Sequence, residues 1–185
     1  MRVIAGTARS LRLVTPEGLG TRPTQDRIKE TLFNIIQNDI PGSVFLDIFS
    51  GSGGIGIEAL SRGAKKAVFI DNDKEAVTCI MQNLAHTKFE NRAEVLAREV
   101  FVALQTLEYK SVFDYVLIDP PYSKDLEKKV LEYLTTSTII NNDTVIIFET
   151  SIDTDVSYLD DLGYNLLREK IYKTNKHVFI SRKEK

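Results

Sequence analysis

The stretch Val44-Phe45-Leu46-Asp47-Ile48-Phe49-Ser50-Gly51-Ser52-Gly53-Gly54-Ile55-Gly56 decides the fold. It begins as a short apolar run, which is typical of a strand buried on both faces. It ends in glycines that match the pattern G-x-G-x-x-G. Such glycines let a ligand approach the backbone, and the start of the following helix offers free amide groups. A strand, a glycine loop and a helix in this order predict a nucleotide-binding site.

The segments around this stretch alternate between strand-like and helix-like patterns. Short apolar runs predict strands, and apolar residues at helical spacing predict helices, one of them with Asp73 as its N-cap. This alternation predicts an α/β fold with a parallel, doubly wound sheet. Strands are expected at Val44–Phe49, Ala67–Asp71, Ala93–Ala97, Tyr115–Ile118 and Thr144–Phe148, and helices at Ile55–Arg62, Lys74–Thr87, Val100–Leu107 and Leu126–Leu134.

The two ends of the chain depart from this alternation. Residues 1–16 alternate loosely and are expected to form a β-hairpin, and a helix is expected over Gln25–Gln37. Near the other end, Leu166–Tyr172 and His177–Ser181 are expected to be strands joined by the polar link Lys173–Lys176. A mostly parallel sheet closed by an antiparallel pair is therefore expected, in one domain over residues 1–185.

The composition is that of a globular protein of 185 residues, with 43% hydrophobic and 27% charged residues. No apolar run approaches the roughly 20 residues that span a bilayer, and Met1–Gly6 shows no signal-peptide pattern. We therefore expect a cytoplasmic protein with no membrane partner. A single cysteine, Cys79, and the distant His86 and His177 predict neither an internal disulfide nor a metal site.

The net charge of −2 hides an uneven distribution. Residues 1–29 carry six Lys or Arg and two Asp or Glu, and residues 164–185 carry seven and two. Residues 30–163 carry 11 basic and 22 acidic residues. Basic ends on an acidic body are consistent with a polyanionic partner held by the ends, and equally with termini that are simply solvated.

Two carboxylates narrow the choice of nucleotide. Asp71 ends the strand after the glycine loop, 20 residues after Gly51, where it can accept hydrogen bonds from ribose hydroxyls. Asp47, four residues before Gly51, would face a dinucleotide pyrophosphate unfavourably, but it suits an ammonium group and a sulfonium centre. These features favour S-adenosyl-L-methionine. A nicotinamide dehydrogenase remains as an alternative on the glycine loop alone.

The tetrapeptide Asp119-Pro120-Pro121-Tyr122 directly follows the apolar run Tyr115–Ile118. Ligands bind beyond the carboxyl ends of the strands in an open parallel sheet, so we expect this loop beside the glycine loop. The prolines make the loop rigid. The Asp119 carboxylate and the Pro120 carbonyl can accept both hydrogens of an amine, which directs its lone pair toward a methyl donor, and Tyr122 offers a face on which a base can stack. The tetrapeptide predicts methylation of an exocyclic amine by alignment and electrostatics.

With these motifs, the chain resembles, nearly end to end, class I methyltransferases of the bacterial RsmD type, which methylate the exocyclic N2 of a guanine in 16S rRNA. Besides the two loops, the resemblance rests on the N-terminal part, from Arg2-Val3-Ile4-Ala5-Gly6 through Arg22-Pro23-Thr24 to Arg27–Asn34. It implies a Rossmann-like fold with a seven-stranded, mostly parallel sheet, one antiparallel strand and helices on both faces. It also implies a basic N-terminal β-hairpin extension over residues 1–22 and a catalytic core over residues 23–185.

The resemblance further implies roles for individual residues. Asp73 competes with Asp71 for the ribose, and we favour Asp71 because it directly follows the apolar run. Where the family often has an Asp after the third strand, near the adenine, this chain has Glu99. The implied partner is 16S rRNA in the 30S subunit, and a monomer is expected. The expected catalytic residues are Asp119, Pro120 and Tyr122; the expected cofactor-binding residues are Thr24, Asp47, Ser50, Gly51, Gly53, Asp71 and Glu99; and the expected substrate-binding residues are Arg2, Arg9, Arg12, Arg22 and Glu149.

Two other functions compete with this one. A DNA adenine-N6 methyltransferase uses a similar tetrapeptide, but 185 residues leave no room for a separate DNA-recognition domain. A non-catalytic RNA-binding or ribosome-assembly factor would keep the fold, and the intact tetrapeptide argues against it.

Overall fold

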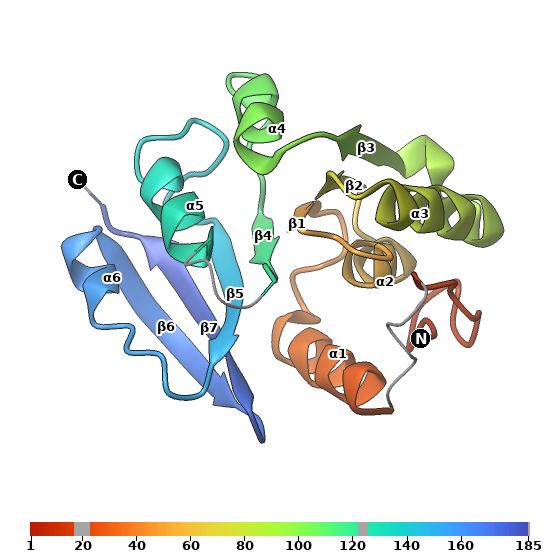
Figure 1. Ribbon diagram of the computed structural model, residues 1–185, viewed down its shortest axis with the longest axis horizontal. Helices are drawn as coiled ribbons and strands as arrows, with labels where there is room; N and C mark the ends of the chain where they lie inside the picture. The colour runs from red at the N-terminus through yellow and green to blue at the C-terminus, as the bar shows by residue number, and fades with distance from the viewer. Residues whose placement is uncertain (17–22, 122–125, 185) are drawn as a thin grey trace.

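A seven-stranded sheet runs through the middle of the computed structural model, which describes residues 1–16, 23–121 and 126–184 (Figure 1). The strand order is β3-β2-β1-β4-β5-β7-β6. Neighbouring strands are parallel, except that β7 is antiparallel to both β5 and β6, so β7 runs against the other six described strands. This confirms the expected topology. The strands are β1 (Val44–Ile48), β2 (Lys66–Asp71), β3 (Ala93–Ala97), β4 (Tyr115–Ile118), β5 (Val145–Ser151), β6 (Tyr164–Ile171) and β7 (Asn175–Arg182).

Helices cover both faces of the sheet (Figure 1). Apolar residues of α1, α2 and α3 pack on one face, and those of α4, α5 and α6 pack on the other. The sheet is therefore buried between two hydrophobic cores, which explains why β1 is apolar at nearly every position. The helices are α1 (Pro23–Ile36), α2 (Gly54–Ser61), α3 (Lys74–Thr87), α4 (Val100–Leu107), α5 (Leu126–Leu134) and α6 (Tyr158–Asp161), with a 3-10 turn at Glu90–Arg92.

The elements of the middle of the chain lie where the sequence predicts them. The predicted bounds of α3, β3, α4, β4 and α5 match the observed ones. Asp73 caps α3 by accepting a hydrogen bond from the Ala76 backbone N–H at 2.9 Å. Cys79 is buried in α3, as expected of a small apolar residue.

The two strands of the C-terminal hairpin have other bounds than predicted: β6 begins and ends earlier, and β7 is longer at both ends. Strand β7 begins at Asn175, so Lys176 belongs to the strand and not to the predicted polar loop. Its side chain is buried because Glu169 of β6 lies 2.7 Å from its ammonium group. An ion pair across the two strands thus makes a lysine acceptable in a buried strand.

The predicted N-terminal hairpin forms in part. Its two arms are joined by a bridge between Arg2 and Arg12 and by backbone hydrogen bonds from the Val3 N–H to Leu11 and from the Leu13 N–H to Met1. Other N–H groups of this segment are bonded to a side chain of α2. The Glu58 carboxylate accepts hydrogen bonds from the Ile4 and Ala5 backbone N–H groups at 2.8 and 3.0 Å. Because these N–H groups are occupied by α2, residues 1–16 wrap over the helix and do not form a regular two-stranded ladder.

Candidate active site

Four acidic residues meet at the carboxyl edge of the parallel strands. In the strand register, Ile48 of β1 lies beside Ile118 of β4, which lies beside Phe148 of β5. Asp119 and Glu149 are the next residues on two adjacent strands, whose backbones are about 4.8 Å apart in a sheet. Asp47 and Asp71 reach the same edge at the ends of β1 and β2. The fold therefore assembles the predicted cofactor and catalytic carboxylates in one place.

The glycine loop is held to this edge by hydrogen bonds from both flanking strands. Gly51 donates its N–H to Asp71 at 2.8 Å, and Gly51 and Gly53 have φ angles of 55° and 75°. The Ser50 hydroxyl donates to the Asp47 carbonyl at 2.6 Å and accepts from the Ile70 N–H at 3.0 Å. The loop is thus preformed, with α2 starting directly behind it.

Phe49 is a residue of this loop that the sequence reasoning missed. Its φ angle of 60° lies in the left-handed region, which non-glycine residues rarely adopt. Such strain is often kept at ligand-binding turns, where the surrounding structure enforces it. No pattern in the sequence marks Phe49, because an aromatic residue after an apolar run looks like a continuation of the strand.

Asp47 is buried and is suited to bind a cation. Only 1% of it is exposed, and its carboxylate accepts a hydrogen bond from the Gly56 N–H at 2.9 Å. Burial and, to a smaller extent, the neighbouring Asp71 raise the pKa of Asp47 to about 7, although the hydrogen bond from Gly56 lowers it. A cation at this position would stabilise the ionised carboxylate. The carboxylates and loop amides present therefore fit S-adenosylmethionine, which carries ammonium and sulfonium charges and ribose hydroxyls.

The two candidates for the ribose carboxylate make different hydrogen bonds. Asp73 is engaged as the cap of α3. Asp71 accepts from the Asp73 and Gly51 N–H groups, at 2.9 and 2.8 Å, and a carboxylate has further lone pairs for two hydroxyls. The side chain of Glu99 caps α4 by accepting from the Phe101 N–H at 3.0 Å. If Glu99 contacts the adenine, the same carboxylate has to serve both the helix cap and the cofactor. This contact stays a prediction.

Asp119 directly follows β4 at the carboxyl edge of the sheet. Its side chain is solvent-exposed, although protein atoms surround it closely enough to desolvate the charged form. This desolvation raises the pKa of Asp119 well above its usual value, and Glu149 and then Asp47 raise it further. A substrate amine can therefore reach a carboxylate with raised basicity. Pro120 is buried behind it, and Tyr122 lies outside the described residues.

Glu149 is linked to two residues, His177 and Tyr172, for which the sequence predicts no role. Its carboxylate lies 3.3 Å from Nε2 of His177, and Nδ1 of that ring lies 3.1 Å from the Tyr172 hydroxyl. His177 faces Glu149 because the two residues are register partners across β5 and β7. The two residues are 28 positions apart in the sequence, which gives no local signal of this contact.

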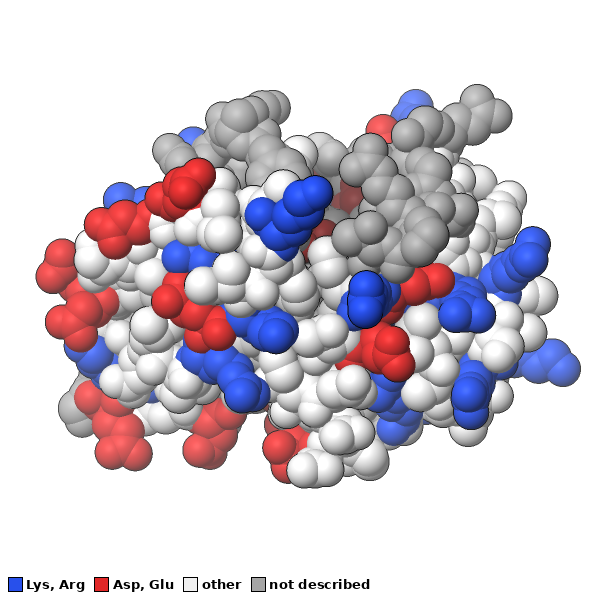
Figure 2. All heavy atoms as spheres, turned by 90° about the horizontal axis from the view of Figure 1, so that it is seen from below, with Lys and Arg blue, Asp and Glu red and all other residues white. Residues whose placement is uncertain are grey.

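The predicted RNA-binding arginines lie on the N-terminal segment. Arg2, Arg9 and Arg12 are exposed, and Arg22 lies outside the described residues, as does the side chain of Thr24. The guanidinium of Arg2 lies 3.5 Å from Asp26 of α1. Basic and acidic side chains are interspersed on the face seen in Figure 2. That face therefore carries no single uninterrupted basic surface.

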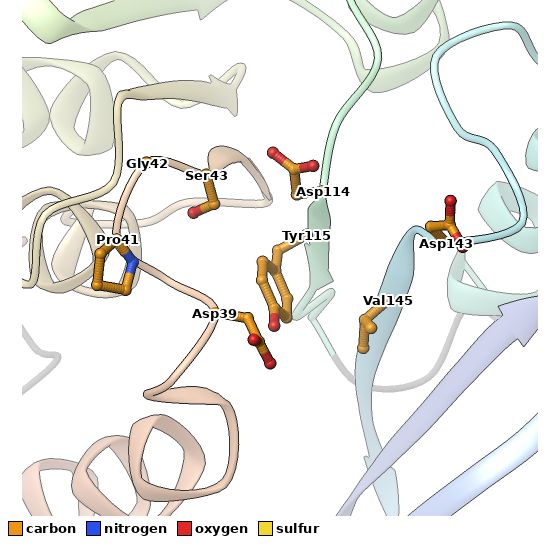
Figure 3. Close-up of a pocket in the computed structure, with 8 residues that line it drawn as sticks. All are labelled: Asp39, Pro41, Gly42, Ser43, Asp114, Tyr115, Asp143 and Val145. Atoms are coloured by element: carbon orange, nitrogen blue, oxygen red, sulfur yellow. The ribbon is translucent and has the colours of Figure 1, made fainter.

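A recess of about 430 Å³ opens at the opposite edge of the sheet. Figure 3 shows it lined by residues that precede or begin β1, β4 and β5, among them Ser43, Tyr115 and Val145. Three aspartates, Asp39, Asp114 and Asp143, also line it. It lies at the amino ends of the strands, so it is not the predicted cofactor site.

The described residues contain neither a cluster suited to bind a metal ion nor a helix suited to cross a membrane. In residues 1–16, 23–121 and 126–184, no group of three or more His, Cys, Asp or Glu side chains is placed to hold a metal ion. Over the same residues, no helix combines the length and the apolar character needed to cross a membrane.

Comparison with known proteins identifies the family. A family model described as "Conserved hypothetical protein 95" matches residues 1–181. Ribosomal RNA small subunit methyltransferase D of Haemophilus influenzae is 36% identical over 171 residues, which cover 92% of this chain and 88% of that protein. The chain belongs to the RsmD family.

The structures agree with this RsmD assignment. The solved structure of yhhF from Escherichia coli superposes with a TM-score of 0.85 at 30% identity, over 100% of this chain and 99% of that chain. SMU.776, solved in complex with SAH, superposes with a TM-score of 0.67 over 87% of this chain and 50% of that one; at 16% identity it shares the fold alone. The RsmD-family chain is a methyltransferase of class I fold that depends on S-adenosylmethionine.

Proposed function

We propose that the chain transfers a methyl group from S-adenosyl-L-methionine to the exocyclic N2 of a guanine in 16S rRNA, in the 30S subunit or an assembly intermediate of it. The observation that carries this proposal is Asp119, an accessible carboxylate beside the glycine loop. The name of the Haemophilus influenzae relative supports ribosomal RNA as the substrate class. We further propose that the protein acts as a monomer in the cytoplasm.

Each part of the site would have a task in this reaction. When bound, the cofactor supplies an activated methyl group, so the protein has to align the amine and need not form a nucleophile of its own. Asp47 would hold the ammonium group and Asp71 the ribose hydroxyls. Asp119 and the Pro120 carbonyl would accept the two amine hydrogens and thereby orient the nitrogen lone pair. Tyr122 would stack on the flipped-out base.

The remaining predicted residues complete the two binding sites. Ser50, Gly51 and Gly53 would offer loop groups to the cofactor, while Thr24 and Glu99 would contact it at its rim. Glu149 would lie close to the target base. These assignments are proposals that substitution can test residue by residue.

The N-terminal segment supports RNA as the partner. Arg2, Arg9 and Arg12 are exposed on a segment that Glu58 fastens to α2, so they are held at a defined place relative to the glycine loop. Phosphate contacts supply much of the affinity for nucleic acids, and Arg22 would add another. Substituting these arginines is expected to weaken RNA binding more at low salt than at high salt, because each lost phosphate contact also reduces the salt dependence of binding.

The test is methyl transfer from labelled cofactor to undermethylated 30S subunits, free 16S rRNA and duplex DNA in parallel. Asp119→Ala is expected to lower the rate on the order of 100-fold or more, because it removes a group that aligns the reacting amine. Asp143→Ala, an exposed aspartate at the opposite edge of the sheet, is the matched control. Full activity of a folded Asp119→Ala variant would show that the proposed site is wrong.

The same assay separates the competing functions. Transfer to duplex DNA in preference to ribosomal RNA would favour the adenine-N6 methyltransferase. Cofactor binding without transfer to any of the three substrates would favour a non-catalytic assembly factor. Mapping the modified nucleotide in ribosomal RNA from a deletion strain would then identify the guanine.

A further inference from the structure

A connected set of side chains leads away from Asp119 into the sheet. Glu149 follows Phe148, the register partner of Ile118, and so lies on the strand next to Asp119. Glu149 Oε2 is 3.3 Å from His177 Nε2, and His177 Nδ1 is 3.1 Å from the Tyr172 hydroxyl. The groups therefore extend from the exposed carboxylate of Asp119 to the turn between β6 and β7.

One assignment of the protons satisfies the hydrogen bonds of this set. His177 is 4% exposed, and the Tyr172 ring meets its ring edge-on at 5.1 Å between centroids. With the proton on Nε2, the imidazole donates to Glu149 and accepts at Nδ1 from the Tyr172 O–H. This assignment satisfies both ring nitrogens with a neutral imidazole and an ionised Glu149.

Two lysines lie next to His177 in the hairpin. Lys176, its neighbour in β7, is paired with Glu169 at 2.7 Å. Lys170, its register partner in β6, is half-buried. Burial, and then Glu149, raise the pKa of Tyr172 to about 12, so its hydroxyl keeps its proton near neutral pH. The hydroxyl hydrogen that Nδ1 accepts is therefore present near neutral pH.

We infer that His177, acting through Glu149, is a positioning residue that enables Asp119 to take up the proton lost by the methylated amine. This inference rests on the proposed function. The amine nitrogen forms a bond to the methyl carbon while the carbon–sulfur bond breaks, and sulfur keeps that electron pair. The nitrogen then carries a positive charge. Its N–H bond breaks, the electron pair returns to nitrogen, and the proton moves to an Asp119 oxygen and later to solvent.

The arrangement makes Asp119 a better proton acceptor than an isolated aspartate. An isolated aspartate has a pKa of about 3.9, and a second carboxylate nearby raises it. In this site, burial, Glu149 and Asp47 raise the pKa of Asp119 in that order. The hydrogen bond from His177 stabilises the ionised form of Glu149, so that Glu149 keeps its charge and Asp119 takes the proton. Without this donor, Glu149 would itself be protonated more readily, and the pKa of Asp119 would fall.

The chain offers a matched control for the test because it contains two histidines, and His86 is exposed on α3. We would compare His177→Leu, His177→Gln and His86→Gln. The first readout is the titration of the Asp119 carboxyl carbon by NMR in protein without cofactor or RNA. The second is the single-turnover methylation rate as a function of pH. Leucine removes the donor to Glu149, whereas glutamine keeps an N–H group.

In His177→Leu, the Asp119 titration is expected to move to lower pH. The acidic limb of the rate profile should move the same way, because a lower pKa leaves Asp119 ionised at lower pH. The plateau rate should fall about tenfold, since proton acceptance is a fraction of the roughly 100-fold or greater effect of general acid–base groups. His177→Gln should lie between His177→Leu and wild type, and His86→Gln should equal wild type. Cofactor affinity should change by less than about twofold, as expected for a defect confined to the reaction step.

The inference is overturned if folded His177→Leu leaves the Asp119 titration where it is, or if Leu and Gln lower the rate equally without moving the acidic limb. If His177→Leu does not fold, Tyr172→Phe replaces it. This variant removes the hydrogen-bond donor to Nδ1 and should shift the Asp119 titration in the same direction. An unchanged titration would again overturn the inference. If the wild-type protein transfers no methyl group to any rRNA, the proposed function is overturned instead. The titration of Asp119 is measured on the protein alone and does not depend on that function.

Discussion

Replacing Glu58 with glutamine is expected to destabilise the protein by about 3–5 kcal/mol, the usual result of removing one partner from a buried ion pair. Glu58 is fully buried, and Lys29, 3.3 Å away, is 2% exposed. The same carboxylate accepts from the Arg62 side chain at 2.8 Å and from the Ile4 and Ala5 N–H groups. Glutamine keeps one acceptor oxygen, turns an NH2 group toward one of these donors and leaves two cations without their counter-charge.

Urea unfolding followed by circular dichroism would measure this loss. With a slope of about 2 kcal/mol per molar urea, the midpoint should fall by about 2 M. Glu94→Gln is the control, because the Lys66–Glu94 pair has similar chemistry but side chains that are 39% and 42% exposed. Such a surface pair contributes about 0–1 kcal/mol. The double variant Lys29→Met with Glu58→Gln should recover part of the loss, because it removes one of the uncompensated cations.

The reasoning would be refuted if Glu58→Gln cost less than about 1 kcal/mol and matched Glu94→Gln. Hydrogen exchange gives an independent check. The Ile4 and Ala5 amides should lose protection in Glu58→Gln, because their acceptor is weakened, while the amides of β1 should be affected only through the global stability.

Three further predictions concern the glycine loop and the pH dependence of stability. Asp47 has a folded pKa of about 7 against 3.8 when unfolded, so its contribution to stability is present below pH 4 and is lost as the pH rises to 7. Asp47→Asn should therefore raise the unfolding free energy at pH 8 by up to about 4 kcal/mol and yet weaken cofactor binding in calorimetry; equal stability of the two proteins at pH 8 would contradict this. Gly56→Ala should lower the unfolding free energy by about 1–3 kcal/mol, because the new Cβ would lie 2.3 Å from the buried Phe69 ring, and an unchanged urea midpoint would show that the ring yields without cost. Glu108 has a pKa lowered to about 2 by hydrogen bonds from Ser137, Thr138 and Tyr133, which outweigh the effect of burial, so its contribution is lost as the pH falls from 4.5 to 2. Glu108→Gln should flatten the stability profile in that window, and a profile that stays as steep as in wild type would assign the acid sensitivity to other groups.

Local sequence patterns were sufficient for the central elements of the fold. Apolar runs and helical spacing predicted β3, β4, α3, α4 and α5 with their observed bounds, because both signals depend on residues that are neighbours in the chain. The glycine loop and the tetrapeptide also carry their signal locally. Their meeting at one edge followed from a general property of parallel sheets, in which all carboxyl ends lie on the same side.

Contacts between residues that are far apart in the chain could not be predicted from the sequence. Lys176 reads as part of a polar loop, and only its pairing with Glu169 across two strands makes it a buried strand residue. The N-terminal segment reads as a hairpin, and only the Glu58 carboxylate shows that two of its amides are bonded to a helix. In both cases the structure depends on a charged side chain whose partner lies elsewhere in the chain, and a local sequence pattern does not identify that partner.

The sequence by itself determined the order of strands and helices, the nucleotide-type loop and the aspartate offered to an amine, because these depend on residue types at short spacing. Only the tertiary structure decided the environment of that aspartate. The pKa of Asp119 depends on how deeply the site is desolvated and on Glu149, and His177 reaches Glu149 through a strand register set 28 residues away. Desolvation and charge coupling depend on distance in space, and that distance exists only once the sheet has formed.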